Sequence, residues 1–384
     1  MTDAPTDQRR CPPLLPLLIA TWLVIFAGTF ASGQVGGDLP ETGRALYENA
    51  CAACHGSDGR GTPAHVVGFD TPLPDFSDCE FAPREADGDW YYVTAEGGPA
   101  RGFSEIMPAF GDALTDEQIQ KILNHIRTFC TNKDWPRGEL NLPRPLKTTK
   151  AYPEDEVVFS STFESEGLGK VTNELIYEKR IGERNQFELI FPFGWAEQPA
   201  SGGTDTDWRG AIEDVGVGFK RVMLHSYESG SIVSLGGEVF FNTGDKDDGL
   251  GSGTTIFEPY LAYGQILPAD YFFQCQAGFE LPSNGKHANE TVFWRGAFGR
   301  TISTGVYGQA WSPMVELIGS KELVSGTDTD WDAIPQLQVA LNRRQHVRLC
   351  FGAKIPLNNR DLRETEYMVY LLWDWFDGGF FEGW

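Results

Sequence analysis

Alternation of apolar and polar residues runs through the second half of the 384-residue chain and restricts what it can fold into. Residues 156–376 contain about twelve such runs of roughly ten residues, and their period of two is that of a β-strand. One run places Phe273, Cys275, Ala277, Phe279 and Leu281 on one face and Gln274, Gln276 and Glu280 on the other. Another alternates Val347, Leu349, Phe351, Ala353 and Ile355 with His346, Arg348, Cys350 and Lys354. No helical pattern interrupts these runs, which predict antiparallel strands.

Two architectures can use such strands. A soluble β-sandwich buries the apolar face against a second sheet, whereas a transmembrane β-barrel turns that face to lipid and keeps a polar lumen. The polar faces carry Gln, Arg, Lys and Glu, as a wet lumen allows, and aromatic residues gather near strand ends at Trp331, Trp373, Trp375 and Phe376. Residues 380–384 end on Trp384, and a terminal aromatic resembles the insertion signal of bacterial outer-membrane barrels. We predict an antiparallel transmembrane β-barrel of about 12 strands over residues 155–384, with the sandwich as the alternative.

A barrel with an even number of strands has both ends on the periplasmic side and its longer connections outside. Residues 202–207, 245–248 and 326–330 are candidates for outer loops, and their carboxylates could hold calcium or simply be solvated. The strand period places Cys275 toward lipid and Cys350 toward the lumen. Side chains on opposite faces cannot bridge, so we predict that these two cysteines are not bonded to each other.

Residues 1–33 have the order of an export signal. Arg9 and Arg10 precede an apolar stretch at residues 14–26, and small residues at 31–33 offer a cleavage site. The apolar stretch falls short of the ~20 residues of a comfortable membrane span, although an uncleaved anchor is the alternative. Export places the mature chain in an oxidising compartment, where disulfides are permitted.

The formal net charge of −23 and the absence of a basic tract argue against nucleic acid as a partner, because a negative field repels phosphates. A cationic partner or a divalent cation suits this charge, as does a plain solvated surface. Residues 131–154 are rich in Lys and in proline, at Pro136, Pro143, Pro145 and Pro153, and we interpret them as a stiff, extended linker. No Ser/His/Asp set, carboxylate pair or phosphate loop indicates a hydrolase or a transferase.

Before the linker, the sequence predicts two helices. Residues 41–51 form the first and lead into a pair of cysteines. The second begins with a capping box formed by Thr115 and Gln118. Its apolar residues share one face at helical spacing, namely Ile119, Ile122, Leu123, Ile126 and Phe129. This face is expected to pack against the first helix.

The run Cys51-Ala52-Ala53-Cys54-His55 is the most specific motif in the chain. Two thiols three positions apart can both bond to the vinyl groups of one porphyrin, and the adjacent imidazole then binds the iron. A zinc knuckle would need two further ligands at similar spacing, and a redox dithiol would need a strand before it. We therefore predict one covalently attached haem c, with Cys51 and Cys54 as its thioether residues and His55 as an iron ligand.

A second iron ligand is expected from a loop further along the chain. Met107 precedes Pro108 just before the capped helix, and its thioether favours ferrous iron and raises the potential. The alternative is a methionine that fills a gap in the core. His65 and His125 are weaker candidates for the same position.

Residues 38–130 resemble a class I cytochrome c, in which residues 43–55 correspond to the first helix and haem motif and Met107-Pro108 to the axial-ligand loop. The resemblance implies outer-sphere electron transfer through a partly exposed haem edge. The pair Cys79 and Cys130 departs from the family pattern. We expect a disulfide between them, with two free thiols as the alternative.

The order of export signal, cytochrome, linker and barrel resembles the fused cytochrome–porins of bacterial outer membranes, some of which oxidise extracellular ferrous iron. The barrel half is also similar to phenol-degradation-type outer-membrane transporters, notably at residues 215–220. These resemblances imply an outer-membrane electron carrier with its cytochrome on the periplasmic side. Its partners would be membrane lipid, a periplasmic electron-transfer protein and an outside donor such as ferrous iron.

Three functions stay open at this point. Electrons pass between the cell exterior or the lumen and periplasmic carriers, or the barrel transports a solute with a tethered cytochrome, or the chain is a membrane-held subunit of a periplasmic oxidoreductase. We expect an electron carrier rather than a substrate-converting enzyme, with an outer-membrane iron oxidase as the enzymatic alternative.

Overall fold

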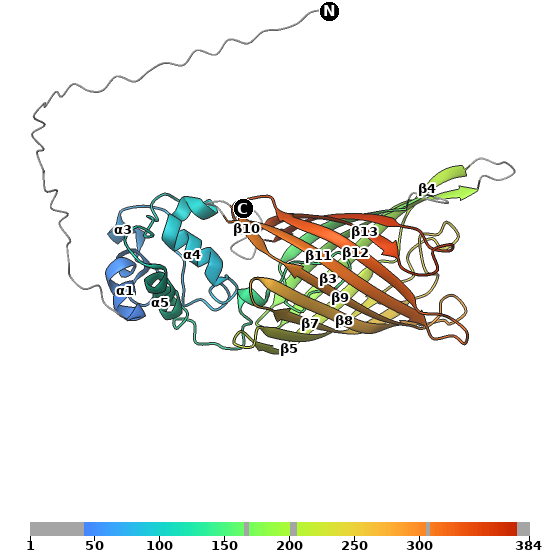
Figure 1. Ribbon diagram of the computed structural model, residues 1–384, viewed down its shortest axis with the longest axis horizontal. Helices are drawn as coiled ribbons and strands as arrows, with labels where there is room; N and C mark the ends of the chain where they lie inside the picture. Colours follow the sequence, from blue (N-terminus) through green and yellow to red (C-terminus); the bar gives the residue numbers. More distant parts are fainter. Residues whose placement is uncertain (1–41, 165–168, 200–205, 305–307, 375–384) are drawn as a thin grey trace, which may run out of the picture. The chain divides into compact units, whose positions relative to one another are not determined.

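The computed structural model describes residues 42–164, 169–199, 206–304 and 308–374 (Figure 1). It contains a helical domain followed by a closed β-barrel. The predicted export signal at residues 1–33, loop residues 202–205, Trp375, Phe376 and the terminal aromatics at residues 380–384 lie outside the described residues.

The helical domain is built on two crossing helices. Its helices are α1 (Gly43–Ala50), α2 (Ala52–His55), α3 (Ala64–Val67), α4 (Asp87–Glu96), the 3₁₀ turn η1 (Gly98–Arg101) and α5 (Asp116–Ile126). Thr42 caps α1, and Thr115 and Gln118 form the predicted capping box of α5. The buried face of α5 comprises Ile119, Ile122, Leu123 and Ile126, as predicted. A Cβ on Gly43 would lie 2.0 Å from the Lys121 carbonyl oxygen, so only glycine allows α1 to approach α5 this closely.

None of the helices in the described part of the chain has the length and apolar character needed to cross a membrane.

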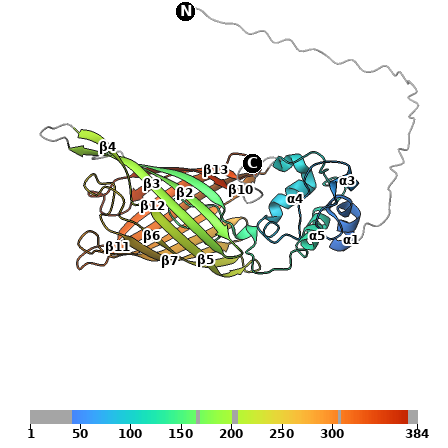
Figure 2. The ribbon, with the colours of Figure 1, turned by 180° about the vertical axis from the view of Figure 1, so that it is seen from behind.

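Twelve of the described strands close into an antiparallel barrel, which confirms the predicted architecture (Figures 1 and 2). In spatial order they are β1 (Glu156–Glu164), β2 (Lys170–Ile181), β3 (Asn185–Pro199), β5 (Gly216–Ser226), β6 (Ser231–Phe240), β7 (Ile256–Ile266), β8 (Tyr271–Pro282), β9 (Thr291–Arg300), β11 (Gln309–Glu322), β12 (Asp330–Ala340), β13 (Val347–Pro356) and β14 (Glu366–Asp374). Pairing of β14 with β1 completes the circle. Two short strands are additions, since β4 (Thr206–Ile212) extends β3 as a hairpin and β10 (Ile302–Thr304) pairs with β11.

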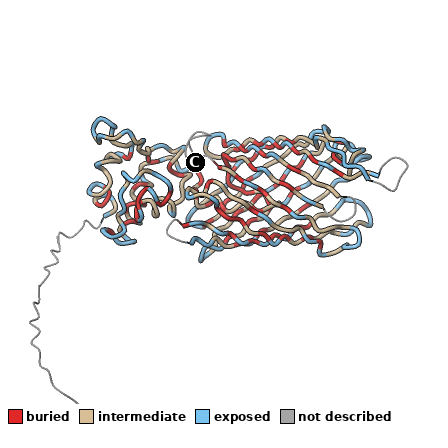
Figure 3. Tube along the Cα trace, turned by 90° about the horizontal axis from the view of Figure 1, so that it is seen from above, coloured by how far each residue is buried: buried red, intermediate tan, exposed pale blue. Residues whose placement is uncertain are grey.

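The barrel has its apolar face outside and its polar face inside. Leu261 and Phe351 point outward and are 50% and 49% exposed, whereas the inward Glu316 is fully buried. Buried and exposed residues alternate along the strands in Figure 3. This arrangement is the reverse of a soluble protein and excludes the sandwich, because an apolar outer wall of this extent requires lipid. Cys350 is buried inside, Cys275 lies on the outward face, and neither forms a disulfide, as predicted.

Glu156 pairs with Asp374, so β1 begins and β14 ends at the same end of the barrel, which we call the β1 end. Connections at the β1 end are short, for example residues 182–184, 227–230 and 267–270, whereas those at the opposite end include residues 241–255, 283–290 and 357–365. Among the described residues, no group of three or more His, Cys, Asp or Glu side chains is arranged to hold a metal ion. The residues of the predicted acidic loops at 245–248 and 326–330 are exposed or half-buried.

Residues 141–154, which we call the lumen segment, lie inside the barrel. They follow the 3₁₀ turn η2 (Gly138–Leu140). Gln274 on β8 donates to the Pro143 carbonyl (2.7 Å), the Leu146 N–H donates to Gln336 on β12 (3.0 Å), and Ser234 on β6 donates to the Ala151 carbonyl (2.5 Å). A chain can reach three separate parts of a closed wall only from the inside. The composition predicts an extended linker over residues 131–154. In the structure, residues 141–154 are extended, but the barrel wall surrounds them.

Wall side chains satisfy the backbone of the lumen segment. The N–H groups of Lys147 and Thr148 donate to the Glu316 carboxylate (3.1 and 2.8 Å), and that of Thr149 donates to Gln276 (3.1 Å). Prolines 143, 145 and 153 have no N–H group that would need a partner. Buried backbone groups are costly when unpaired, so this combination of prolines and polar wall residues explains how a non-helical, non-strand segment is tolerated at this depth.

Candidate functional site

The predicted haem-binding residues occupy a single turn of the chain. Cys51 ends α1 by donating its N–H to the Tyr47 carbonyl (2.9 Å). The N–H groups of Cys54 and His55 both donate to the carbonyl of Cys51, the N-cap of α2 (3.1 and 2.9 Å), which places the two thiols and the imidazole on one helical turn. Gly56 then reverses the chain with a φ of 74°, a conformation that favours glycine.

His55 is held as a neutral ring. Its imidazole stacks on Phe76 with ring centroids 5.1 Å apart, and burial lowers the pKa of His55 to about 4. The neutral imidazole is the form that binds a metal. Its Nδ1 atom is buried and has no hydrogen-bond partner among the described residues.

The two cysteines of the turn are free and half-buried. Burial, with a smaller contribution from Cys54, raises the pKa of the Cys51 thiol to about 11. A redox dithiol needs the opposite shift, because the thiolate is its reactive form. A protonated Cys51 thiol beside a neutral imidazole therefore fits a porphyrin anchor better than a dithiol site.

Met107 lies on a separate loop between η1 and α5. Its carbonyl accepts from the Gly98 N–H (3.0 Å), and a Cβ on Gly98 would lie 2.1 Å from the Ser104 carbonyl oxygen, so the glycine allows a tight loop. Met107 is half-buried and does not belong to the apolar core formed by Leu46, Tyr47, Phe76, Ala95, Leu114, Ile119, Ile122, Leu123 and Ile126. This position does not favour the alternative in which the methionine fills a core gap.

The two rival histidines lie in different surroundings. His65, on α3, is exposed. His125, on α5, packs edge-on against Tyr47 and Phe129, with ring centroids 5.3 and 5.1 Å away, and burial lowers the pKa of His125. His125 thus contributes to the contact between α1 and α5.

Replacing Met107 by alanine tests its assignment as a ligand. The loss of the thioether is expected to lower the haem midpoint potential by roughly 100 mV or more, within the range of about 0.8 V that axial ligands cover. Spectroelectrochemical titration of the full chain measures this shift. Met314→Leu, at a buried methionine of the barrel, is the matched control and should leave the potential unchanged. An unchanged midpoint potential in Met107→Ala would show that Met107 is not an iron ligand.

A disulfide joins Cys79 to Cys130, with 5.3 Å between their Cα atoms. The bond connects the turn before α4 to the chain after α5, and the 51-residue separation spans the Met107 loop. It therefore fixes both ends of the stretch that carries the proposed second ligand.

Sequence patterns did not identify the aromatic residues around the turn. Phe76 stacks on His55, Trp90 meets Phe76 edge-on at 5.3 Å, and the Tyr47 hydroxyl donates to the Gly56 carbonyl (2.8 Å). Tyr47 could have been identified from the sequence, since it lies one helical turn before Cys51 on the predicted first helix. Phe76 and Trp90 come from segments with no regular spacing to the motif.

Comparison with known proteins identifies the helical domain. Residues 38–126 match the sequence model of the family described as cytochrome C oxidase, cbb3-type, subunit III. No curated protein matches the chain.

Solved structures similar to the barrel include the NanC porin, with 11% identity, a TM-score of 0.41 and coverage of 57% of this chain and 99% of that one. An outer membrane channel from Pseudomonas putida F1 shares 12% identity and a TM-score of 0.41, covering 60% of this chain and 99% of that one. The KdgM porin shares 10% identity and a TM-score of 0.38, covering 57% and 98%. The family match and the closed barrel together show that the chain is a fusion of a cytochrome c domain with a β-barrel.

Proposed function

We propose that this protein carries single electrons through one haem c, covalently attached at Cys51 and Cys54, and that its barrel holds this carrier at the bacterial outer membrane. His55 and Met107 would be the iron ligands. The bound haem iron would supply the exchange of one electron between its ferrous and ferric states. The observation that carries the proposal is the α2 turn, which presents two free thiols and a neutral imidazole side by side.

The strand connections support a periplasmic position for the cytochrome domain. Bacterial outer-membrane barrels have short periplasmic turns and longer outer loops. The short connections lie at the β1 end, and the cytochrome domain directly precedes the lumen segment and β1 in the chain. The β1 end would therefore face the periplasm, together with the domain.

The lumen segment supports a tethered carrier. Residues 131–141 span at most about 40 Å at full extension, which limits how far the cytochrome domain can lie from the anchored chain. Such a tether raises the effective concentration of the haem for any redox protein that docks at the same membrane.

A conduit across the membrane is less well supported. The hydrocarbon layer is ~30 Å thick, too far for one efficient tunnelling step, so a donor such as ferrous iron would have to reach the haem itself. The lumen segment occupies the interior that a folded donor protein would need. A solute transporter meets the same obstruction.

Accessibility of the haem in whole cells tests this proposal. A membrane-impermeant reductant added to intact cells is expected to leave the haem oxidised, and permeabilising the outer membrane should allow prompt reduction. The haem absorption of the cell suspension reports both steps. A haem that is reduced at once in intact cells would support the conduit instead.

A further inference from the structure

A row of carboxylates crosses the inner wall of the barrel. Residues that lie directly opposite one another on adjacent strands are Asp374, Glu156, Glu178, Glu188, Gly218, Glu238 and Glu258, on β14, β1, β2, β3, β5, β6 and β7. Glu156 is the first residue of β1, at the β1 end, whereas Glu258 is the third residue of β7, which begins at the opposite end. Because barrel strands are tilted, a row that follows the register climbs from one mouth toward the other.

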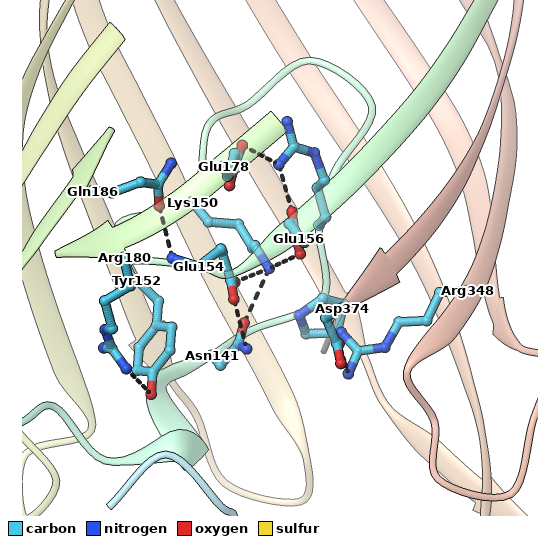
Figure 4. Close-up of polar contacts among 12 residues, drawn as sticks. Asn141, Lys150, Tyr152, Glu154, Glu156, Glu178, Arg180, Gln186, Arg348 and Asp374 are labelled. Atoms are coloured by element: carbon cyan, nitrogen blue, oxygen red, sulfur yellow. Dashed lines mark hydrogen bonds and ion pairs between the residues drawn. The ribbon is translucent and has the colours of Figure 1, made fainter. Parts of the chain in front are cut away.

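The lumen segment neutralises Glu156 and Glu178 of this row, whereas Asp374 faces Arg348 of the wall at 3.6 Å. Arg144 Nη1 lies 2.7 Å from both Glu156 Oε1 and Glu178 Oε1. Lys150 Nζ pairs with Glu154 and lies 3.5 Å from Glu156 Oε2 (Figure 4). Arg144, Lys150 and their three carboxylate partners are buried or nearly so, and a buried charge is stable only when it is paired. Both cations come from the lumen segment rather than from the wall.

In the part of the chain that the structure describes, the other half of the row has no close ion pair, although the buried wall cation Lys220 on β5 and Arg144 of the lumen segment are near enough to act on Glu188 electrostatically. Glu188 is only 6% exposed, yet neither Glu188 nor Glu238 forms a hydrogen bond or ion pair with any residue in the described ranges. Within the described residues, Glu258 forms one ion pair, a long contact of 4.0 Å with Arg295. A Cβ on Gly218 would lie 3.1 Å from Glu238 Cγ and 3.2 Å from Glu188 Cβ, so the two side chains flank the glycine from either side.

Like charges on adjacent strands destabilise a sheet, and a carboxylate buried without a partner costs more still. The unpaired half of the row must therefore be neutralised, either by protons or by mobile cations from the lumen. A lumen wall of carboxylates attracts cations and repels anions, as acidic rings do in cation channels.

We propose that the carboxylate row is a path for small inorganic cations and that the lumen segment is its resident plug, with Arg144 and Lys150 as tethered counter-ions. This function belongs to the barrel and goes beyond the electron transfer proposed above. With the plug seated, its two cations occupy positions on the path. When the plug leaves, those positions become available to ions from solution.

Planar-bilayer recordings of the purified holoprotein in potassium chloride test this function. The full chain should be almost closed, whereas Arg144→Gln/Lys150→Gln should raise the mean current severalfold. In a potassium chloride gradient its reversal potential should indicate a roughly tenfold preference for potassium over chloride, the scale of electrostatic focusing in a charged cleft. Adding Glu188→Gln/Glu238→Gln to this variant should abolish most of the preference.

Two further variants keep the test decisive. Lys354→Gln removes a wall cation that pairs with Glu366 at 2.5 Å, and it should stay as closed as the full chain. If Arg144→Gln/Lys150→Gln does not fold, as judged by heat-dependent gel mobility, Glu316→Gln loosens the plug at Lys147 and Thr148 and should also raise the current. A full chain that conducts as well as these variants would overturn the plug. An open variant that prefers chloride, or has no preference, would overturn the cation path.

Discussion

Replacing both Cys51 and Cys54 by alanine is expected to reduce covalently bound haem to background. The two thiols lie on one turn, next to the neutral His55 imidazole, and no other free cysteine lies in the described part of the cytochrome domain. Without a thioether, haem is lost when the protein is denatured. Haem staining of a denaturing gel, normalised to protein, measures the loss.

The chain provides its own controls for this experiment. Cys275 and Cys350 are free cysteines of the barrel, and Cys275→Ala/Cys350→Ala should retain all of the covalent haem. If haem stays bound in the Cys51→Ala/Cys54→Ala protein under denaturing conditions, the attachment site lies elsewhere and the assignment fails.

Removing the disulfide is expected to produce the largest loss of stability. In the chain-entropy picture, Cys79→Ala/Cys130→Ala should lower the free energy of unfolding of the cytochrome domain by about 4 kcal/mol, because the bond closes a long loop in the unfolded chain. Urea unfolding of the full chain, followed by haem absorption, isolates this domain from the barrel.

Two controls show whether a change in stability comes from the loss of the disulfide. The wild-type protein treated with a reductant should unfold at the same urea concentration as the double variant. Cys350→Ala should unfold with the oxidised wild type. Equal stability of Cys79→Ala/Cys130→Ala and wild type would show that the bond is not formed in the native protein or does not constrain its unfolded state.

Sequence patterns predicted the helices and strands that are determined by interactions between residues close together in the chain. The Thr115 capping box and the apolar face of α5 follow from helical spacing alone. The strands follow from their period of two, which also placed Cys275 outside and Cys350 inside. By contrast, α4 was not predicted, because its apolar residues do not gather on one face.

The lumen segment shows where sequence patterns fail. An extended, proline-rich chain has the same local sequence whether water or a barrel wall surrounds it. What distinguishes the two is contact with residues more than a hundred positions away, such as Gln276 with Thr149 and Glu316 with Thr148. A signal was present in the inward faces, whose buried Gln and Glu residues need hydrogen-bond partners inside the lumen.

The site shows the same division. The Cys51–His55 spacing indicates haem chemistry because both thiols must reach one porphyrin. The ring that stacks on His55 could not be predicted, since Phe76 reaches it through the tertiary fold. Met107 could be predicted only in part. The loop before Pro108 is recognisable in the sequence, but Met107 lies far along the chain from the Cys51–His55 motif.

One chain joins a covalently bound haem to a membrane barrel in the function proposed above. This arrangement is tested by separating outer-membrane, inner-membrane and soluble fractions of cells competent in cytochrome maturation and staining one gel for haem. We predict a single haem-positive band in the outer-membrane fraction whose mobility changes on heating, as a folded barrel requires. A colourless band at that position, or haem only in the soluble fraction, would contradict the account.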